Sequence, residues 1–395
     1  MTLSRDYKNV GILAACQALF MSGMSMQIIL GGLVGATIAE DKALATLPIS
    51  AVVIASTLST IPASLLMKRI GRRAGFILGN LLGLTGAAIA SYALTISSFW
   101  LFCFGMFIFG MNAGFSSYLR FAAADVSAAS FRSRAISWVV SGGIVAALLG
   151  PELAKRSHDL FPATPFLGAF VVLCGLVIAG MALMAFLDIP PPGEDERLES
   201  GRSLSTIVRQ PALIVAVVVG MIGYGVMNLL MTATPLAMVG HGFIISDATF
   251  VIQWHMVAMF APAFFTGTLI QRIGVVRVML GGTVMLGCAI VSALSGADLV
   301  HYWLALFALG LGWNFTYIGA STLLTETYEP AEMGKVQALN DFMVFGTVAL
   351  ASLTSGTILY FLDWNAVNYA AIGPITVAVL AALWLRLKRR AQQAA

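Results

Sequence analysis

Apolar residues in this chain form long runs separated by short polar turns, rather than alternating at the spacing of a strand or of a half-buried helix. A helix needs about 20 largely apolar residues to cross the hydrocarbon core of a bilayer, and the runs reach that length repeatedly. The pattern therefore predicts an all-α membrane protein with twelve transmembrane helices. The predicted spans are residues 9–38, 45–67, 74–96, 99–122, 135–156, 165–187, 211–239, 248–270, 275–297, 302–326, 336–361 and 367–386.

Composition excludes a soluble protein. Hydrophobic residues make up 59% of the chain and charged residues 10%, whereas a soluble domain carries roughly 25% charged residues. The first apolar run lacks the small-residue cleavage site of a signal peptide and is interpreted as a span. The four cysteines fall in four different spans and form no CxxC pair, so packing is the expected role for each. They are Cys16, Cys103, Cys174 and Cys288.

Basic residues are distributed unequally between the two sides of the predicted helices. The outer segments hold only Lys42, Lys155 and Arg156, and the remaining lysines and arginines fall in inner segments. Since Lys and Arg favour the cytoplasmic side of a membrane, both termini are predicted to be cytoplasmic. The net charge of +4 then reflects topology, and no nucleic-acid partner is expected.

A polar stretch rich in Pro, Gly and charge, residues 189–210, predicts a cytoplasmic linker between two six-helix bundles, residues 1–188 and 211–395. The two parts repeat a sequence pattern. "MKRIGRRAGFILGN" at 67–80 corresponds to "IQRIGVVRVMLGG" at 270–282, and a Gly-x-Asn triplet recurs at 110–112 and 312–314. Two pseudo-symmetric six-helix units are typical of secondary transporters.

These motifs resemble the major facilitator superfamily over essentially the whole chain. The family signature between the second and third helices is G-x-L-x-D-R-x-G-R-R, and the chain has "SLLMKRIGRR", with Lys68 in place of the Asp. The second copy has Gln271 at that position. A Gly-Pro pair, Gly150 and Pro151, ends the fifth span as in the family's Gly-Pro helix motif. The resemblance implies the fold of that family and alternating access.

Two four-residue motifs suggest a soft metal ion. Met227 and Met231 are one helical turn apart in the seventh span, and His255 and Met259 are one turn apart in the eighth. With 19 Met in the chain, about one such Met pair is expected by chance. Both pairs nevertheless fall roughly 10–12 Å or more below the outer surface, at ~1.5 Å per residue. Thioethers favour cuprous copper, so the four side chains are predicted to form one site, with helix packing as the alternative.

MxxxM followed by HxxxM resembles the CcoA-type bacterial copper importers. That resemblance implies a transporter of the bacterial inner membrane that imports copper for assembly of cbb-type cytochrome oxidase. Copper is then the substrate, and no permanently bound cofactor is expected. This interpretation suggests a copper carrier or chaperone as a partner, in addition to the lipid bilayer. The protein is expected to be a monomer.

Further candidates lie at the two ends of the helices. Met238 and His241 are candidates for outer capture of copper, with an ordinary surface position as the alternative. Asp341 is interpreted either as a proton carrier or as the partner of a basic residue at an inner gate. The predicted inner gate consists of Arg69, Arg72, Arg120, Asp125, Glu326 and Asp341.

Three other functions are alternatives to copper import. An importer of a small organic solute such as riboflavin is the alternative, with Trp254, Trp313 and Phe315 lining a flavin-sized cavity. A membrane copper sensor or assembly factor is disfavoured, because it needs no second six-helix half. An enzyme is not expected, since the spans contain no nucleophile–base pair or phosphate-binding loop.

Overall fold

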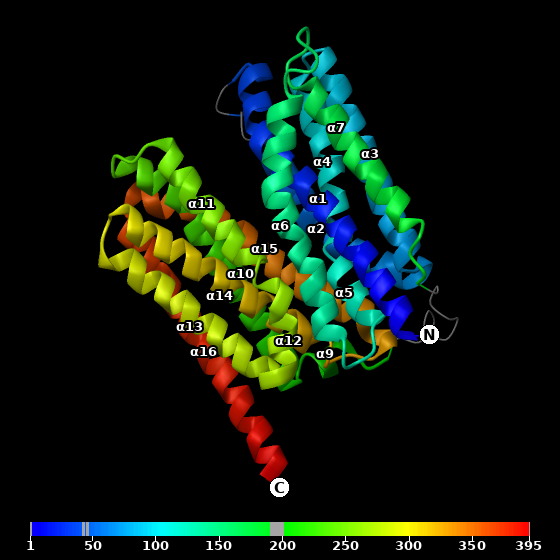
Figure 1. Cartoon of the computed structure of the whole chain (residues 1–395), viewed down its shortest axis with the longest axis vertical. Coiled ribbons are helices and arrows are strands. Elements are labelled where there is room, and N and C mark those ends of the chain that lie inside the picture. Colours follow the sequence, from blue (N-terminus) through cyan, green and yellow to red (C-terminus); the bar gives the residue numbers. More distant parts are fainter. Residues whose placement is uncertain (1, 42–43, 45–46, 190–200, 395) are drawn as a thin grey trace. The chain divides into compact units, whose positions relative to one another are not determined.

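The computed structural model describes residues 2–41, 44, 47–189 and 201–394, and these ranges are almost wholly helical (Figure 1). Eleven of the helices described there are long and apolar enough to cross a membrane, and one bent pair can supply a twelfth span. The prediction of an all-α membrane protein is confirmed. Lys42 and residues 190–200 of the predicted linker lie outside the described residues.

The helices follow the predicted spans closely. Those before the linker are α1 (Thr2–Ile38), α2 (Leu47–Ile70), α3 (Arg72–Thr95), α4 (Phe99–Ser116), α5 (Leu119–Asp125), α6 (Arg132–Ser157) and α7 (Leu167–Met184). Those after it are α9 (Leu204–Ile207), α10 (Pro211–Gly240), α11 (Ile245–Phe260), α12 (Ala263–Ile273), α13 (Val275–Ser295), α14 (Leu299–Leu324), α15 (Met333–Phe361) and α16 (Trp364–Ala394). The predicted span 99–122 is divided into α4 and α5 by a turn at Ser117 and Tyr118.

The predicted span 248–270 is also not one straight helix. Its two parts, α11 and α12, meet at an angle of 42°. Pro262 precedes the first residue of α12, and a proline lacks the backbone N–H that would continue the hydrogen-bond ladder. The bend was therefore visible in the sequence as "FAPAF", but it was not predicted.

The described chain forms two compact units. Unit 1 comprises Met1–Ser127, Gly142–Ser200 and Pro330–Phe342. Unit 2 comprises Ala128–Ser141, Gly201–Glu329 and Met343–Ala395. The boundaries fall inside α6 and α15, so each of these two helices contributes one part to unit 1 and another part to unit 2.

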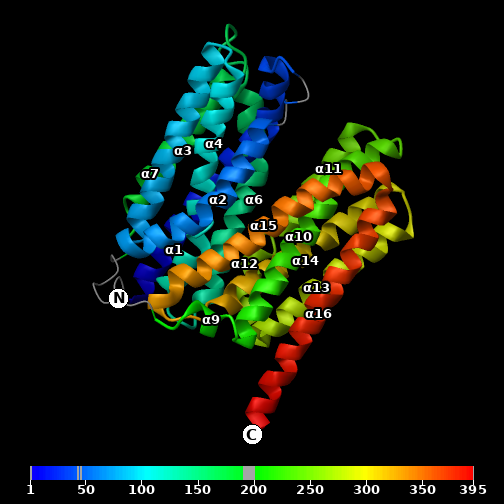
Figure 2. The same ribbon diagram turned by 180° about the vertical axis from the view of Figure 1, so that it is seen from behind.

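Unit 1 is built on close packing of α3 and α4, which lie side by side in both views (Figures 1 and 2). A Cβ atom on Gly86 would meet the backbone of Phe109, and one on Gly105 would meet the backbone of Ala90. Small residues allow such backbone contact between membrane helices, where dispersion replaces the hydrophobic effect as the main driving force.

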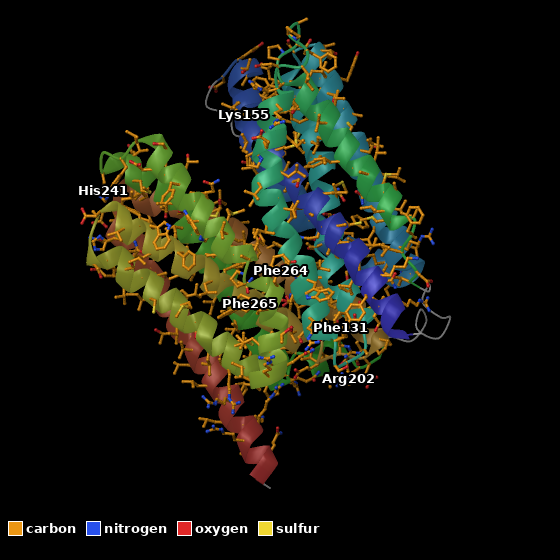
Figure 3. All side chains as sticks on the ribbon, viewed as in Figure 1. Phe131, Lys155, Arg202, His241, Phe264 and Phe265 are labelled. Carbon is orange, nitrogen blue, oxygen red and sulfur yellow. The ribbon has the colours of Figure 1, made fainter. Side chains whose placement is uncertain are left out.

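Unit 2 has the same kind of packing around α14, which contacts α10, α11 and α13. A Cβ atom on Gly310 would lie within 3.0 Å of the Met259 nitrogen, so the backbones of α11 and α14 are in direct contact. Phe264 and Phe265 of α12 are 58% and 52% exposed (Figure 3).

Two turns show the internal repeat in backbone geometry. Gly71 between α2 and α3 has φ 87° and ψ 161°, and Gly274 between α12 and α13 has φ 90° and ψ 148°. This region of conformational space is open almost only to glycine. The two glycines correspond in the sequence repeat, and each allows one helix to end and the next to begin without a loop.

Candidate functional site

The Met and His candidates of unit 2 are mostly enclosed in helix packing. Met227, His255 and Met259 are buried, and Met231 is half-buried. The His255 Nδ1 atom lies 2.7 Å from the Leu306 carbonyl oxygen of α14. Because a carbonyl only accepts, Nδ1 carries the proton and donates it, which leaves Nε2 as the free lone pair. Nε2 is buried and has no hydrogen-bond partner in the described part of the chain.

The turn from His255 to Met259 packs against α14. Asn314 donates from Nδ2 to the Met259 carbonyl oxygen at 2.6 Å, and Gly310 faces the His255 carbonyl. The predicted copper site required this turn to converge with Met227 and Met231 of α10. Within the described ranges, no group of three or more His, Cys, Asp or Glu side chains could hold a metal ion. Met thioethers are not covered by that finding, so the convergence of the four side chains stays a prediction.

The two candidates for outer capture differ in exposure. His241 follows the last residue of α10 and is exposed, and its Nδ1 atom lies 2.6 Å from the Tyr302 hydroxyl (Figure 3). Met238 is fully buried. The Met238 sulfur is therefore not presented at the surface, as capture of an ion from outside would require.

Four of the six predicted gate residues come together in unit 1. Arg72 of α3 pairs with Asp125 of α5 at 2.7 Å, and the same Nη2 atom donates to Gln337 Oε1 at 2.5 Å. Arg120 of α5 pairs with Asp341 of α15 at 2.5 Å, with exposed side-chain fractions of 4% and 0%. We call Arg72, Arg120, Asp125, Gln337 and Asp341 the charged cluster.

The other two predicted gate residues do not join this cluster. Arg69 is exposed at the end of α2. Glu326 belongs to unit 2 and forms an exposed ion pair of 2.5 Å with Arg389 of α16. Sequence reasoning had grouped these residues by their position at inner helix ends, a criterion that says nothing of which neighbour each side chain faces.

Unit 2 contains a group of stacked and edge-on rings that sequence reasoning largely missed. We call it the aromatic cluster; its members are Tyr224 of α10, Phe260 of α11, Trp313 and Tyr317 of α14, and Phe345 of α15. Trp313 stacks on Tyr317 with centroids 4.9 Å apart and an interplanar angle of 16°. Tyr224 packs edge-on against Trp313, Tyr317 and Phe345 at 5.3 to 5.8 Å.

The aromatic cluster includes polar atoms without protein partners. The Trp313 Nε1 atom is buried and has no hydrogen-bond partner among the described residues, and the same holds for Asn228 Oδ1. Asn228 follows Tyr224 by one turn of α10, so both lie on one face of that helix. Tyr224, Asn228 and Phe345 are half-buried, so the cluster has a partly open edge on α10 and α15.

Of the three aromatic residues expected to line a flavin-sized cavity, Trp313 alone is in this cluster. Trp254 is 40% exposed and packs against Phe250 and Trp303. Phe315 lies against Gly282 of α13. The spacing Trp313-x-x-x-Tyr317 was the available signal for the cluster, since it places two rings on one helical face.

Comparison with a characterised relative corrects the predicted substrate. The chain is 41% identical over 383 residues to the riboflavin transporter RfnT of Brucella anthropi, and the match covers 96% of each protein. Copper import as the function, with its role in cbb-type oxidase assembly, is therefore wrong. The resemblance to the CcoA-type copper importers, which suggested copper import, is wrong as well. The two four-residue motifs had been given more weight than their random frequency allows.

The family comparison agrees with the architecture. The sequence pattern of the Major Facilitator Superfamily matches residues 13–346 and 224–395. The uncharacterised transporter YddS of Bacillus subtilis is 25% identical, with 97% of this chain and 92% of that protein covered. The fucose:proton symporter FucP of E. coli has the same fold, with a TM-score of 0.76 at 17% identity over 95% of this chain and 98% of that one. The chain belongs to the Major Facilitator Superfamily.

Proposed function

We propose that this protein imports a small organic solute of the riboflavin class by alternating access. The observation that carries the proposal is the 41% identity to a riboflavin transporter over 96% of both proteins. A match of that extent includes the helices on which the aromatic cluster lies.

The aromatic cluster supports a flat, conjugated substrate. The isoalloxazine ring of riboflavin is planar, and such rings stack on aromatic side chains with about 1–3 kcal/mol per stacked ring. Tyr224 and Trp313 lie near the middles of α10 and α14, the depth at which secondary transporters bind their substrates.

The polar atoms of the cluster complement the pyrimidine edge of a flavin. That edge presents carbonyl and ring-nitrogen acceptors on either side of an N–H donor. Trp313 Nε1 is a donor and Asn228 Oδ1 is an acceptor, and both lack protein partners in the described ranges. A buried polar group left unpaired costs about 1–3 kcal/mol, so pairing with a substrate would recover that cost.

The charged cluster supports a role in closing one end of the transporter. Ser64 donates to the Gly334 carbonyl at 2.8 Å, Arg72 to Gln337, and Arg120 to Asp341. The three acceptor residues lie on one face of the first turns of α15. In the proposed function these contacts hold the cytoplasmic side closed and must break for the solute to be released there.

The proposed location is the bacterial inner membrane, with both termini cytoplasmic. The support is the excess of Lys and Arg on one side of the spans, including the basic end of α16 with Arg386, Lys388, Arg389 and Arg390. The bilayer is the expected environment, and no partner protein is required for transport.

The deciding experiment is uptake of radiolabelled riboflavin into cells that lack their own riboflavin importer, with and without this chain. Expression is expected to confer saturable uptake that unlabelled riboflavin and lumichrome inhibit. Copper uptake, measured in the same cells, is expected to remain at the level of cells without the chain. Absence of riboflavin uptake at confirmed membrane abundance would refute the proposal.

A further inference from the structure

The break between α11 and α12 in unit 2 is occupied by a side chain from a third helix. Pro262, which directly precedes α12, has no N–H to give to the Ala258 carbonyl one turn earlier. The next carbonyl along the chain, that of Met259, accepts from the Nδ2 atom of Asn314 of α14 at 2.6 Å. Sharp bends in helices occur where a proline or an inserted side chain interrupts the hydrogen-bond ladder, and both are present here.

The same amide also bonds to the other side of the break. The Thr266 hydroxyl, in the first turn of α12, lies 2.6 Å from Asn314 Oδ1 and 2.8 Å from the Pro262 carbonyl oxygen. That carbonyl already accepts from the backbone N–H groups of Phe265 and Thr266, each at 2.9 Å. Because Asn314 Oδ1 only accepts, the shorter contact requires the hydroxyl proton, and Thr266 donates to Asn314.

The helices on the two sides of the break pack on different neighbours. On the α11 side, His255 donates to the Leu306 carbonyl of α14 at 2.7 Å. On the α12 side, Ser133 of α6 donates to the Gly267 carbonyl and Ser137 of α6 accepts from the Gly267 N–H, both at 3.0 Å. Asn314 therefore ties together two helices that are held by different parts of unit 2.

The internal repeat provides a comparison for this bridge. The counterpart of α11 and α12 in unit 1 is α2, which is one unbroken helix. Asn112 corresponds to Asn314, and its Oδ1 atom accepts from Ser116 of its own helix at 3.2 Å. Ala63 occupies the position of Thr266 and has no hydroxyl to complete a bridge. The bridging pair of Asn and Thr thus occurs in the repeat whose helix is broken.

The break lies next to the aromatic cluster. Phe260 is the last residue of α11, two positions before Pro262. Its ring packs edge-on against Trp313, with centroids 5.6 Å apart and an interplanar angle of 76°, and both side chains are buried. Trp313 directly precedes Asn314 in the chain. The position of the Phe260 ring on Trp313 therefore depends on the angle at which α11 ends.

We propose that Asn314 is a positioning residue of the solute site. By bonding to both sides of the break it fixes the angle between α11 and α12, and so holds the Phe260 ring against Trp313. Both polar atoms of its amide are engaged by protein groups, so it acts through Phe260 and not through contact with the solute. The inference rests on the proposed function and adds to it a residue outside the aromatic cluster.

The first experiment is titration of riboflavin with purified protein, followed by quenching of flavin fluorescence. Thr266→Val removes one bond of the bridge and is expected to weaken riboflavin binding at least about threefold. Asn314→Leu removes both bonds and is expected to weaken it at least about tenfold. Wild-type affinity in both variants would overturn the inference and leave the proposed function intact. Absence of binding by the wild-type protein would instead refute the proposed function.

Two matched controls have equally buried groups that bond within one helix. The Thr283 hydroxyl donates to the Leu280 carbonyl of α13 at 2.9 Å, and the Asn368 amide donates to the Trp364 carbonyl of α16 at 2.8 Å. Thr283→Val and Asn368→Leu are expected to bind riboflavin within about twofold of wild type. Losses equal to those of Thr266→Val and Asn314→Leu would overturn the inference, because any buried polar group would then serve as well.

The second experiment distinguishes positioning from a general contribution to stability. If Asn314 acts through Phe260, then Thr266→Val and Asn314→Leu introduced into a Phe260→Leu protein should weaken binding by less than about twofold further. The decrease in unfolding temperature, by contrast, should still be present in that background. Losses of affinity that add fully in the double variants would overturn the proposed route through Phe260.

A rescue variant covers misfolding of Asn314→Leu. If that protein does not fold, Thr266 decides, because Thr266→Val leaves the bond between Asn314 and the Met259 carbonyl in place. Thr266→Ser keeps the hydroxyl and is expected to bind riboflavin within about twofold of wild type. Weaker binding by Thr266→Val with recovery in Thr266→Ser supports the inference. Equal losses in the two variants, or no loss in Thr266→Val, overturn it.

Discussion

Substitution of Trp313 tests whether the aromatic cluster binds the solute. Trp313 has ring contacts with Tyr224, Phe260 and Tyr317 at 4.9 to 5.6 Å, and its Nε1 atom has no partner in the described ranges. Trp313→Phe keeps an aromatic ring and removes the N–H donor. Trp313→Leu removes both the donor and the flat ring, so the two variants separate hydrogen bonding from stacking.

The expected magnitudes follow from these contacts. A neutral hydrogen bond contributes about 0.5–1.5 kcal/mol, so Trp313→Phe should weaken riboflavin binding by roughly 2- to 12-fold. Loss of a stacking surface costs about a further 1–3 kcal/mol. Trp313→Leu should therefore weaken binding by roughly 10-fold to 2,000-fold, with each ~1.4 kcal/mol giving a factor of ten.

The assay is titration of riboflavin with purified protein in detergent, followed by the quenching of flavin fluorescence. Trp303 is a matched control, because it lies on the same helix, stacks on Phe307 at 5.4 Å and also has a buried Nε1 atom without a described partner. Trp303→Phe and Trp303→Leu are expected to bind within about twofold of wild type. Equal losses at Trp303 and Trp313, or wild-type affinity in Trp313→Leu, would refute a solute site at the aromatic cluster.

Three further predictions concern the helix contacts and the former metal candidates. Asp125→Asn should increase labelling by cytoplasmic-side cysteine probes, because removing one member of a partly buried ion pair costs up to several kcal/mol; unchanged labelling would contradict a gate role. Gly267→Val should lower the amount of folded protein, since its side chain would meet the backbone of α6 at a cost of about 1–3 kcal/mol. Gly240→Val, where a Cβ meets nothing within 4 Å, is the control for steric effects. Met231→Leu nearly conserves volume and should leave riboflavin uptake and abundance unchanged, whereas a large loss of uptake would point to a need for the sulfur.

The sequence predicts the spans well, because the length of an apolar run is set directly by the thickness of the bilayer. It also indicates four members of the charged cluster, because each is a charged residue at or near the inner end of a predicted span. It does not indicate Gln337, which shares Arg72 with Asp125. A neutral amide gives no signal in a hydropathy pattern, and its role depends on the neighbour that it faces.

Spacing alone does not determine whether the four Met and His side chains converge on one site. Four-residue spacing fixes that two side chains share a face, and helix length fixes their depth. Neither quantity fixes the rotation of a helix about its own axis. His255 donates to the Leu306 carbonyl of α14, a contact made possible by the close approach at Gly310. The aromatic cluster was missed for the same reason, because its rings come from four helices that are far apart in the sequence.

The internal repeat relates a contact at the start of α15 to a contact at the start of α6. Ser64 of α2 donates to the carbonyl of Gly334, the second residue of α15, at 2.8 Å in unit 1. In unit 2, Ser133, the second residue of α6, donates to the carbonyl of Gly267 of α12 at 3.0 Å.

Ser64 and Gly267 occupy corresponding positions of the repeat. In unit 1 this position holds the serine that donates to a glycine carbonyl, and in unit 2 it holds the glycine whose carbonyl accepts from a serine. The charges, by contrast, are not repeated. Val275 occupies the position that corresponds to Arg72. At the α6 contact, the Ser137 hydroxyl donates to the Ala263 carbonyl and accepts from the Gly267 N–H. The two corresponding helix contacts thus differ: the α15 contact includes the Arg120–Asp341 ion pair, whereas the contact of α6 with Gly267 consists of hydrogen bonds with Ser133 and Ser137 beside the Arg134 backbone. Separating α15 from α5 therefore means breaking a buried ion pair as well as hydrogen bonds, whereas separating α6 from α12 means breaking hydrogen bonds.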